Sequence, residues 1–319
     1  MDKRELGRSG ISVAPLAFGG NVFGWTIDEN KSFGLLDAFV DAGFNLVDTA
    51  DVYSRWAEGN QGGESETIIG NWLKKTGKRK DVVIATKVGM DLGDSKKGLS
   101  GDYISRAVED SLKRLQTDYI DLYQSHKDDE NALQEETLEA YAKLIEQGKV
   151  CAVGASNFSA ARLRESLEIS EKLGIPSYQT LQPQYNLYDR AEFERELEPF
   201  CLEKNIGVIN YYALASGFLS GKYRSEADLS KSPRGQKAKD YLNERGQRIL
   251  KALDETAEKY NSTPASVSIA WLIARPSITA PIASATNLDQ LKDLAEAANL
   301  KLDDDSIKQL DEASAERSV

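Results

Sequence analysis

Three short apolar runs in the sequence each end in a side chain that can hold or transfer a proton. The run 44–47 ends in Asp48, with Tyr53 five residues later; the run 82–86 ends in Lys87; the run 119–125 ends in His126, the single histidine. These runs are rich in residues that favour strands. Because the carboxyl ends of parallel strands meet at one mouth of a barrel, we expect the four side chains to lie together.

An acid, a phenol, an amine and an imidazole suit proton transfer to or from an oxygen atom. A free tyrosine titrates near 10, and we expect the Lys87 cation to ease the loss of the Tyr53 proton. Asp48 is expected to keep Lys87 charged, and a neutral His126 to donate a hydrogen bond to a carbonyl oxygen. The set predicts carbonyl reduction or alcohol oxidation, with a cofactor supplying the hydride. Taken singly, each residue also has a structural reading, such as a lysine that reaches solvent.

The elements that must position these residues alternate along the chain. A hairpin over 5–13 is followed by eight expected strands, at 16–20, 44–47, 82–86, 119–125, 150–154, 178–182, 207–211 and 279–283. Helical patterns cover 30–42, 64–75, 101–115, 133–147, 159–173, 191–204, 247–260, 288–298 and, as an extra carboxyl-terminal helix, 304–315. Eight strand–helix repeats predict an α/β fold, a parallel (β/α)8 TIM barrel. With no linker in the sequence, we expect residues 1–319 to form a single domain.

The second half of the chain offers polar residues at the ends of its expected strands. Ser156 and Asn157 precede a helix, and Gln182 ends a strand; these side chains suit a carboxamide, although Ser and Asn before a helix are also ordinary caps. Tyr211 ends the seventh strand and can stack on a flat ring or simply pack in the core. The loops after the last two strands, where barrels commonly bind phosphate, contain Lys222, Arg234, Ser284 and Thr286.

Composition and charge indicate which partners and which compartment the protein is expected to have. The 319 residues are 40% hydrophobic and 29% charged, and the net charge of −11 disfavours nucleic acid and anionic membranes as partners. Cys151 and Cys201 lack a CxxC spacing, so we expect free thiols in a reducing compartment and no metal site. Neither a signal peptide nor a membrane span is expected. A cytoplasmic protein that acts on a small molecule is predicted.

Six motifs in this sequence resemble those of the aldo-keto reductase family. They are DTADVYS at 48–54, TKVG at 86–89, DLYQSH at 121–126, GASNF at 154–158, QPQYN at 182–186 and GFLSGKY at 217–223. The resemblance covers nearly the whole chain. It implies a (β/α)8 barrel enzyme that reduces aldehydes or ketones to alcohols, reversibly, with NADPH. It also implies that Asp48, Tyr53, Lys87 and His126 are a catalytic tetrad in which Tyr53 is the general acid.

The same resemblance implies the contacts of the dinucleotide. Ser156, Asn157 and Gln182 are expected to hold the carboxamide, and Tyr211 to stack on the nicotinamide. The further contacts that it implies are Leu214, Ser216, Lys222, Thr286 and Gln290. Asn287 stands where relatives often carry a basic residue near the 2′-phosphate, and Tyr212-Ala213-Leu214 where many have Ser-Pro-Leu. We expect NADP(H) to be preferred and NAD(H) to be usable.

Two other functions fit the same residues. Similarity to the potassium-channel β-subunit branch implies a redox-sensing protein that binds the dinucleotide with little turnover. A Schiff-base aldolase would use Lys87 as its nucleophile and would need no dinucleotide. For the substrate, Trp25 and Trp56 are expected to line a pocket beside Tyr53 that favours aromatic or alicyclic carbonyl compounds.

Overall fold

The computed structural model describes residues 2–93, 96–232 and 235–316. Near the amino terminus, β1 (Arg4–Glu5) and β2 (Ser12–Val13) pair antiparallel as the predicted hairpin. Eight further strands form one parallel sheet in the order β10, β3, β4, β5, β6, β7, β8, β9. These strands are β3 (Ala17–Gly19), β4 (Leu46–Asp48), β5 (Val83–Val88), β6 (Ile120–Ser125), β7 (Val150–Ser156), β8 (Thr180–Gln182), β9 (Gly207–Val208) and β10 (Ile282–Ala283).

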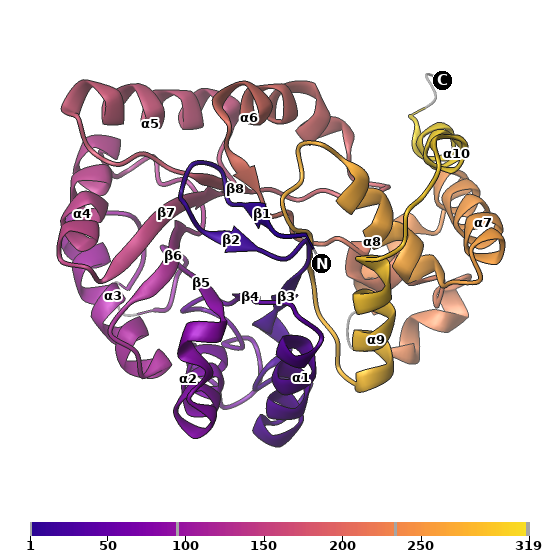
Figure 1. The fold of residues 1–319 in the computed structure, drawn as a ribbon, viewed down its shortest axis with the longest axis horizontal. Helices are drawn as coiled ribbons and strands as arrows, with labels where there is room; N and C mark the ends of the chain where they lie inside the picture. Colours follow the sequence, from indigo (N-terminus) through magenta and orange to yellow (C-terminus); the bar gives the residue numbers. More distant parts are fainter. Residues whose placement is uncertain (1, 94–95, 233–234, 317–319) are drawn as a thin grey trace.

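Backbone hydrogen bonds also join the two outer strands of this sheet. The N–H of Thr279 donates to the carbonyl of Val208 at 2.8 Å, and the N–H of Ile282 donates to the carbonyl of Asn210 at 2.9 Å. The sheet therefore curls round on itself, and Figure 1 shows the helices arranged outside it. The predicted (β/α)8 fold is confirmed.

The helices that follow the strands begin where the sequence provides a cap. The side chains of Ser100 and Ser159, for example, accept hydrogen bonds from the backbone N–H groups of Tyr103 and Arg162. The helices are α1 (Glu29–Asp41), α2 (Glu64–Thr76), α3 (Gly101–Leu115), α4 (Gln134–Glu146), α5 (Ala160–Leu173), α6 (Glu198–Lys204), α7 (Glu244–Lys259), α8 (Pro264–Ala274), α9 (Leu288–Ala297) and α10 (Asp304–Ser314). Short helical segments lie at η1 (Gly20–Val22), η2 (Lys78–Asp81), η4 (Ala215–Ser220), η5 (Glu226–Lys231) and η6 (Gly235–Tyr241).

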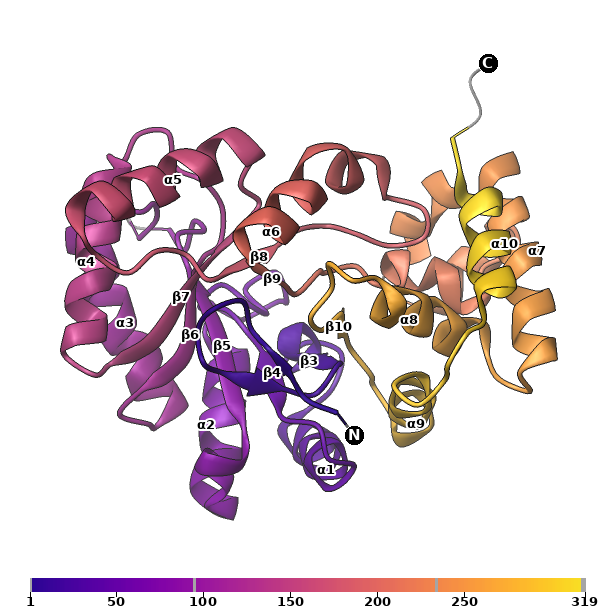
Figure 2. The ribbon, with the colours of Figure 1, turned by 45° about the horizontal axis from the view of Figure 1, so that its top comes forward.

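Two helical predictions need correction. Helix α8 was not predicted from the sequence. It is apolar around most of its circumference, so no polar face reveals a helical period. It is α8 that completes the seventh strand–helix unit, whereas α7 packs with α10 at one side of the barrel (Figures 1 and 2). The helix expected over 191–204 is divided into a π-helical turn, η3 (Phe193–Leu197), and α6.

Apolar side chains form two layers of core. The larger cluster fills the space between the sheet and the helices. The smaller cluster lies among inward-facing side chains of the strands and includes Leu6 and Val13 of the hairpin. Figures 1 and 2 show the hairpin lying across the barrel. Gly7 packs against Gln179, which precedes β8, and against Gly207, the first residue of β9. The hairpin therefore covers the amino-terminal end of the barrel and leaves the other mouth free for chemistry.

We predict that Gly207→Ala destabilises the protein. A Cβ atom at this position would lie 2.5 Å from the Gly7 nitrogen and 2.9 Å from the Leu6 carbonyl carbon, both of which are backbone atoms. Overpacking of this kind costs about 1–3 kcal/mol, measurable as a lower midpoint of urea unfolding. The control is Gly34→Ala in α1, where the new Cβ would meet no atom within 4 Å and helix propensity favours alanine by about 1 kcal/mol. Equal stability of the two variants would contradict the described packing of the hairpin.

Candidate active site

Strand alternation brings the predicted catalytic side chains to one mouth of the barrel. In the sheet, Leu46 pairs with Val83 and Asp48 with Ala85, while Ala85 in turn pairs with Leu122. The apolar members of this set belong to the inner core. Since side chains repeat every two residues along a strand, Asp48, Lys87 and His126 extend the same inward-facing rows beyond that core. Sequence reasoning had predicted their convergence from the strand ends alone.

Lys87 is the centre of the site. Its side chain has no exposed surface, and its Nζ lies 2.7 Å from Asp48 Oδ2, 2.8 Å from the Thr49 carbonyl oxygen and 2.9 Å from the Tyr53 hydroxyl. An ammonium group has three donors, and these three oxygens engage all of them. The lysine therefore does not reach solvent, and Asp48 provides the counter-charge that the sequence analysis expected.

The pKa of Tyr53 depends on burial and on the charges of its neighbours. Its hydroxyl oxygen lies 2.9 Å from Lys87 Nζ and 3.4 Å from Asp48 Oδ2. Burial, followed by the negative charge of Asp48, raises the pKa of Tyr53 well above its ordinary value. Burial also lowers the pKa of Lys87, although Asp48 opposes that shift. Burial and Asp48 therefore outweigh the effect expected from Lys87 while the site is at rest, and the phenol keeps its proton at neutral pH.

His126 adds a neutral ring beside the phenol. The two ring centroids are 5.9 Å apart in an edge-to-face arrangement. Burial, then the charges of Lys87 and Lys127, lower the pKa of His126 well below its ordinary value. A neutral imidazole carries one N–H donor, so the mouth contains two neutral donor groups, from His126 and Tyr53, next to the Lys87–Asp48 ion pair. Such a pair of donors can bind one carbonyl oxygen.

The residues predicted to hold a carboxamide form a connected network next to this mouth. Ser156 Oγ donates to the Gln182 carbonyl at 2.9 Å, and Asn157 Nδ2 donates to the His126 carbonyl at 3.0 Å. Tyr211 hydroxyl donates to Asn157 Oδ1 at 2.7 Å. Gln182 Nε2 donates to Asp48 Oδ1 at 2.9 Å. This contact was not predicted, and it joins the network to the Asp48–Lys87 ion pair.

The predicted phosphate-side residues lie on the loops after β9 and β10. Leu214 and Ser216 are part of a turn in which Ala215, Ser216 and Gly217 all have positive φ. Lys222 is exposed, and its amine lies beside Gly217, because a Cβ atom on that glycine would be 2.8 Å from Nζ. Arg234 lies outside the described residues.

The last loop is already organised by its own side chains. Ser284 Oγ donates to the Gly19 carbonyl at 2.8 Å, and the backbone N–H of Thr286 donates to Gln290 Oε1 at 2.8 Å. Asn287 caps α9 by accepting from the Gln290 N–H at 2.9 Å. Asn287 therefore acts as the helix cap, which is the ordinary role of an asparagine in this position.

Aromatic side chains line the approach to Tyr53. Trp56 is 50% exposed, and its ring centroid lies 6.0 Å from that of Tyr53 and 5.5 Å from that of Trp25. The structure thus places both predicted pocket tryptophans near the phenol. It adds Tyr212, which sequence reasoning missed: this partly exposed residue has φ of +56° and contacts Tyr211 edge-to-face at 5.1 Å.

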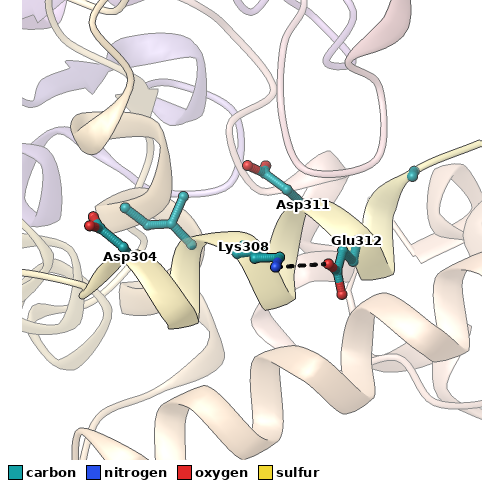
Figure 3. A pocket seen from close by; sticks show the side chains of 6 residues that line it. Asp304, Lys308, Asp311 and Glu312 are labelled. Atoms are coloured by element: carbon teal, nitrogen blue, oxygen red, sulfur yellow. Dashed lines mark ion pairs between the residues drawn. The ribbon is translucent and has the colours of Figure 1, made fainter.

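A hollow on another part of the described surface has a different character. It lies on the outer face of α10 and is lined by Asp304, Ile307, Lys308, Asp311, Glu312 and Ala315 (Figure 3). Its charged side chains include the Lys308–Glu312 ion pair at 3.9 Å, a common surface arrangement along a helix. Within the described part of the chain, no three His, Cys, Asp or Glu side chains are grouped so as to hold a metal ion. No helix there has the length and apolar character needed to cross a membrane.

The closed parallel sheet and its Lys87-centred mouth define a (β/α)8-barrel protein, and comparison with known proteins identifies its family. Residues 15–315 match the model of the aldo/keto reductase family, and the chain belongs to that family. It is 34% identical to the uncharacterized oxidoreductase YrpG of Bacillus subtilis, over 98% of this chain and 95% of the relative. It is 33% identical to the aldo-keto reductase YhdN of the same organism, over 95% and 88% of the two chains.

A third relative is named for a different role. The chain is 32% identical to a probable voltage-gated potassium channel subunit beta of Arabidopsis thaliana, over 94% of this chain and 92% of that protein. The suspected family is thus confirmed, and the similarity to channel β-subunits is real at the level of sequence. The family membership supports an oxidoreductase.

We predict that Asp48 and Lys87 contribute to stability as one unit. Asp48→Asn leaves the buried Lys87 charge without its counter-charge, which costs about 3–5 kcal/mol when a buried pair is broken. Lys87→Met removes the other partner, and the double variant contains neither charge. The summed losses of the single variants should therefore exceed the loss in the double variant by more than about 0.5 kcal/mol, measured by urea unfolding. Additive losses would show that the two side chains do not interact.

Proposed function

We propose that this protein is an NAD(P)H-dependent oxidoreductase that reduces aldehydes or ketones to alcohols, reversibly, with Tyr53 as the general acid. The observation that carries the proposal is the 2.9 Å contact between the Tyr53 hydroxyl and Lys87 Nζ, beside Asp48. A phenol that is protonated at rest can give its proton to a substrate oxygen. The lysine at its oxygen then stabilises the phenolate that is left.

Each residue of the set has a distinct task in this reaction. The carbonyl oxygen of the substrate binds between the Tyr53 hydroxyl and the His126 ring. Bound NADPH supplies the hydride, which no side chain can provide. The Tyr53 proton goes to the carbonyl oxygen as negative charge develops there, and His126 stabilises that charge by a hydrogen bond. Asp48 keeps Lys87 positively charged, so the tyrosinate has a cation beside it until it is protonated again. Alcohol oxidation follows the same steps in reverse.

The residues at the mouth fit a nicotinamide dinucleotide. Tyr211 offers a half-buried ring at the end of the seventh strand, and Ser156 and Asn157 offer an amide-binding edge beside it. The turn at 215–217, with the Lys222 amine next to it, lies where barrels commonly bind phosphate. In this arrangement Gln182 donates a hydrogen bond to Asp48 and also lies with the residues that would bind the carboxamide of the nicotinamide. Cofactor binding is thereby coupled to the tetrad.

The aldolase alternative is disfavoured by the surroundings of Lys87. A Schiff-base lysine must be a neutral amine that reaches the substrate carbonyl carbon. Here the amine is fully enclosed and is bound to a carboxylate, a backbone carbonyl and a phenol. The regulatory alternative keeps one specific observation in its favour, the similarity to a channel β-subunit. Multiple-turnover consumption of NADPH with a carbonyl substrate separates a reductase from a protein that binds and holds its dinucleotide.

The two thiols support the proposed reducing compartment. Cys151 is exposed and Cys201 is buried, and both are free. We therefore place the protein in the cytoplasm, where thiols stay reduced.

Tyr53→Phe should lower kcat for carbonyl reduction by at least about a hundredfold, because a positioned proton donor contributes about 10²–10⁴-fold. The substitution keeps the ring, so the Kd for NADPH should change little. Stopped-flow reduction with NADPH and a panel of aldehydes gives both values. Tyr119→Phe, which removes a hydroxyl just before β6, at the other end of that strand from His126, is the matched control. A Tyr53→Phe protein that retains near-full kcat would remove Tyr53 from the reaction.

We further propose that NADP(H) is preferred over NAD(H). Lys222 is a described cation on the loop after β9 and lies beside the turn at 215–217, whereas the first turn of α9 carries the acidic Asp289. A charge-assisted hydrogen bond contributes about 1.5–3 kcal/mol, so one engaged cation gives roughly a ten- to hundredfold tighter Kd for NADPH. The Kd values for NADPH and NADH should be compared in wild type, Lys222→Ala and Arg234→Ala at low and high salt. Equal affinities in the wild type, or tighter NADH, would refute the preference.

A further inference from the structure

A carboxyl group outside the tetrad is buried next to it, and the proposed reaction does not use this group. Asp51 lies in the loop after β4, between Asp48 and Tyr53, and is 1% exposed. Its backbone N–H donates to the Lys87 carbonyl at 3.2 Å, so the residue adjoins the strand that carries the lysine. Neither of its carboxyl oxygens has a hydrogen-bond partner of acceptable geometry among the described residues.

The cations around Asp51 are already engaged by other groups. Lys87 uses its three donors on Asp48, the Thr49 carbonyl and Tyr53. Arg114 Nε donates to Glu66 Oε2 at 2.7 Å, and Glu66 is itself fully buried. Two cations thus face two carboxylates, and an ionised Asp51 would add a third negative charge whose oxygens have no hydrogen bond of acceptable geometry among the described residues. Burying such a charge is costly, so a group in this position takes up a proton instead.

The groups that face Asp51 come from every neighbouring element. They are Glu66 on α2, Tyr103 and Arg114 on α3, Lys87 on β5, Tyr123 on β6 and Tyr141 on α4. Burial raises the pKa of Asp51 well above its ordinary value, and the Glu66 carboxylate adds to the effect. Arg114, the N–H of Val52 and Lys87 oppose the shift. The Tyr123 hydroxyl is also buried without a partner among the described residues, so this layer offers Asp51 little polar compensation.

We propose that Asp51 is a positioning residue which the protein holds as an uncharged carboxylic acid at neutral pH, and that loss of its proton changes the charge balance at Lys87 and Tyr53. While Asp51 is uncharged, Asp48 and Glu66 are balanced by Lys87 and Arg114. Once Asp51 ionises, its negative charge lies behind the strand of Lys87 and favours the charged lysine and the protonated phenol. Carbonyl reduction therefore continues to a higher pH than the four tetrad residues alone would allow.

The protonation state can be measured without any activity. Infrared difference spectra of the wild type and Asp51→Asn at neutral pH should show a carboxylic-acid carbonyl stretch that the variant lacks. The same band should be present in the Tyr53→Phe protein, so its detection does not depend on the proposed reaction. Asp121→Asn, which removes a carboxylate paired with Arg79 at 2.8 Å, is the control and should keep the band. A wild type without this band would overturn the proposal.

Stability gives a second readout with a definite sign. A carboxyl group whose pKa is higher in the folded than in the unfolded protein stabilises the fold at low pH, and this contribution is lost as pH rises between the two values. The wild type should therefore lose stability relative to Asp51→Asn as pH rises above the ordinary pKa of aspartate. Asp51→Leu, an apolar replacement of similar size, should fold and show the same trend. If the difference between wild type and either variant is independent of pH, Asp51 is already ionised and the proposal fails.

The kinetic consequence rests on the proposed reductase function. At neutral pH, kcat/KM of Asp51→Asn should lie within about twofold of wild type. Its alkaline decline should begin about one pH unit lower, as expected for loss of one charge at short range in the protein. Superimposable pH profiles would refute the action of Asp51 on the tetrad, even where the infrared band is found. Absence of any turnover in both proteins would count against the proposed function instead, and the infrared and stability results would still decide the state of Asp51.

Discussion

The site depends on one physical constraint, which is that the Lys87 cation is buried without any exposed surface. An isolated ammonium group in such a place would be strongly unfavourable. Asp48 Oδ2 at 2.7 Å, the Thr49 carbonyl and the Tyr53 hydroxyl compensate for the lost water. The parallel register of β4 and β5 makes this possible, because it pairs Asp48 with Ala85, two residues before Lys87 on the same inward-facing row. Asp48 is in turn fixed by Gln182 from across the barrel.

Burial also explains the charge states of the other groups. It raises the pKa of Tyr53 and of Asp51, and it lowers the pKa of His126. In each case the neutral form is favoured, as expected where water is excluded. The charges that remain are the Asp48–Lys87 and Glu66–Arg114 pairs, each of which joins neighbouring elements of the barrel. A set of neutral donors around a compensated cation is well suited to stabilise negative charge that develops on a substrate oxygen.

Much of this arrangement could be predicted from the sequence. Strand-like runs that end in Asp48, Lys87 and His126 gave the barrel and its mouth, because strand ends converge in this fold. The helix α8 escaped detection since it is apolar on nearly all sides. The net rise of the Tyr53 pKa was not predicted, because the effect of Lys87 was considered without the opposing effects of burial and Asp48. Asp51 lies within the DTADVYS motif, but its unpartnered state depends on side chains from five other elements, which no local pattern reveals.

The most direct measurement of the central claim is the titration of Tyr53 itself. Ultraviolet difference spectra of wild type against Tyr53→Phe, recorded from neutral pH to above pH 10, isolate the absorbance of this one tyrosinate. We expect no tyrosinate signal from Tyr53 at neutral pH, and a titration above the ordinary value of 10.0. A Tyr53 that is ionised at neutral pH would contradict the claim that burial and Asp48 hold the phenol as a proton donor.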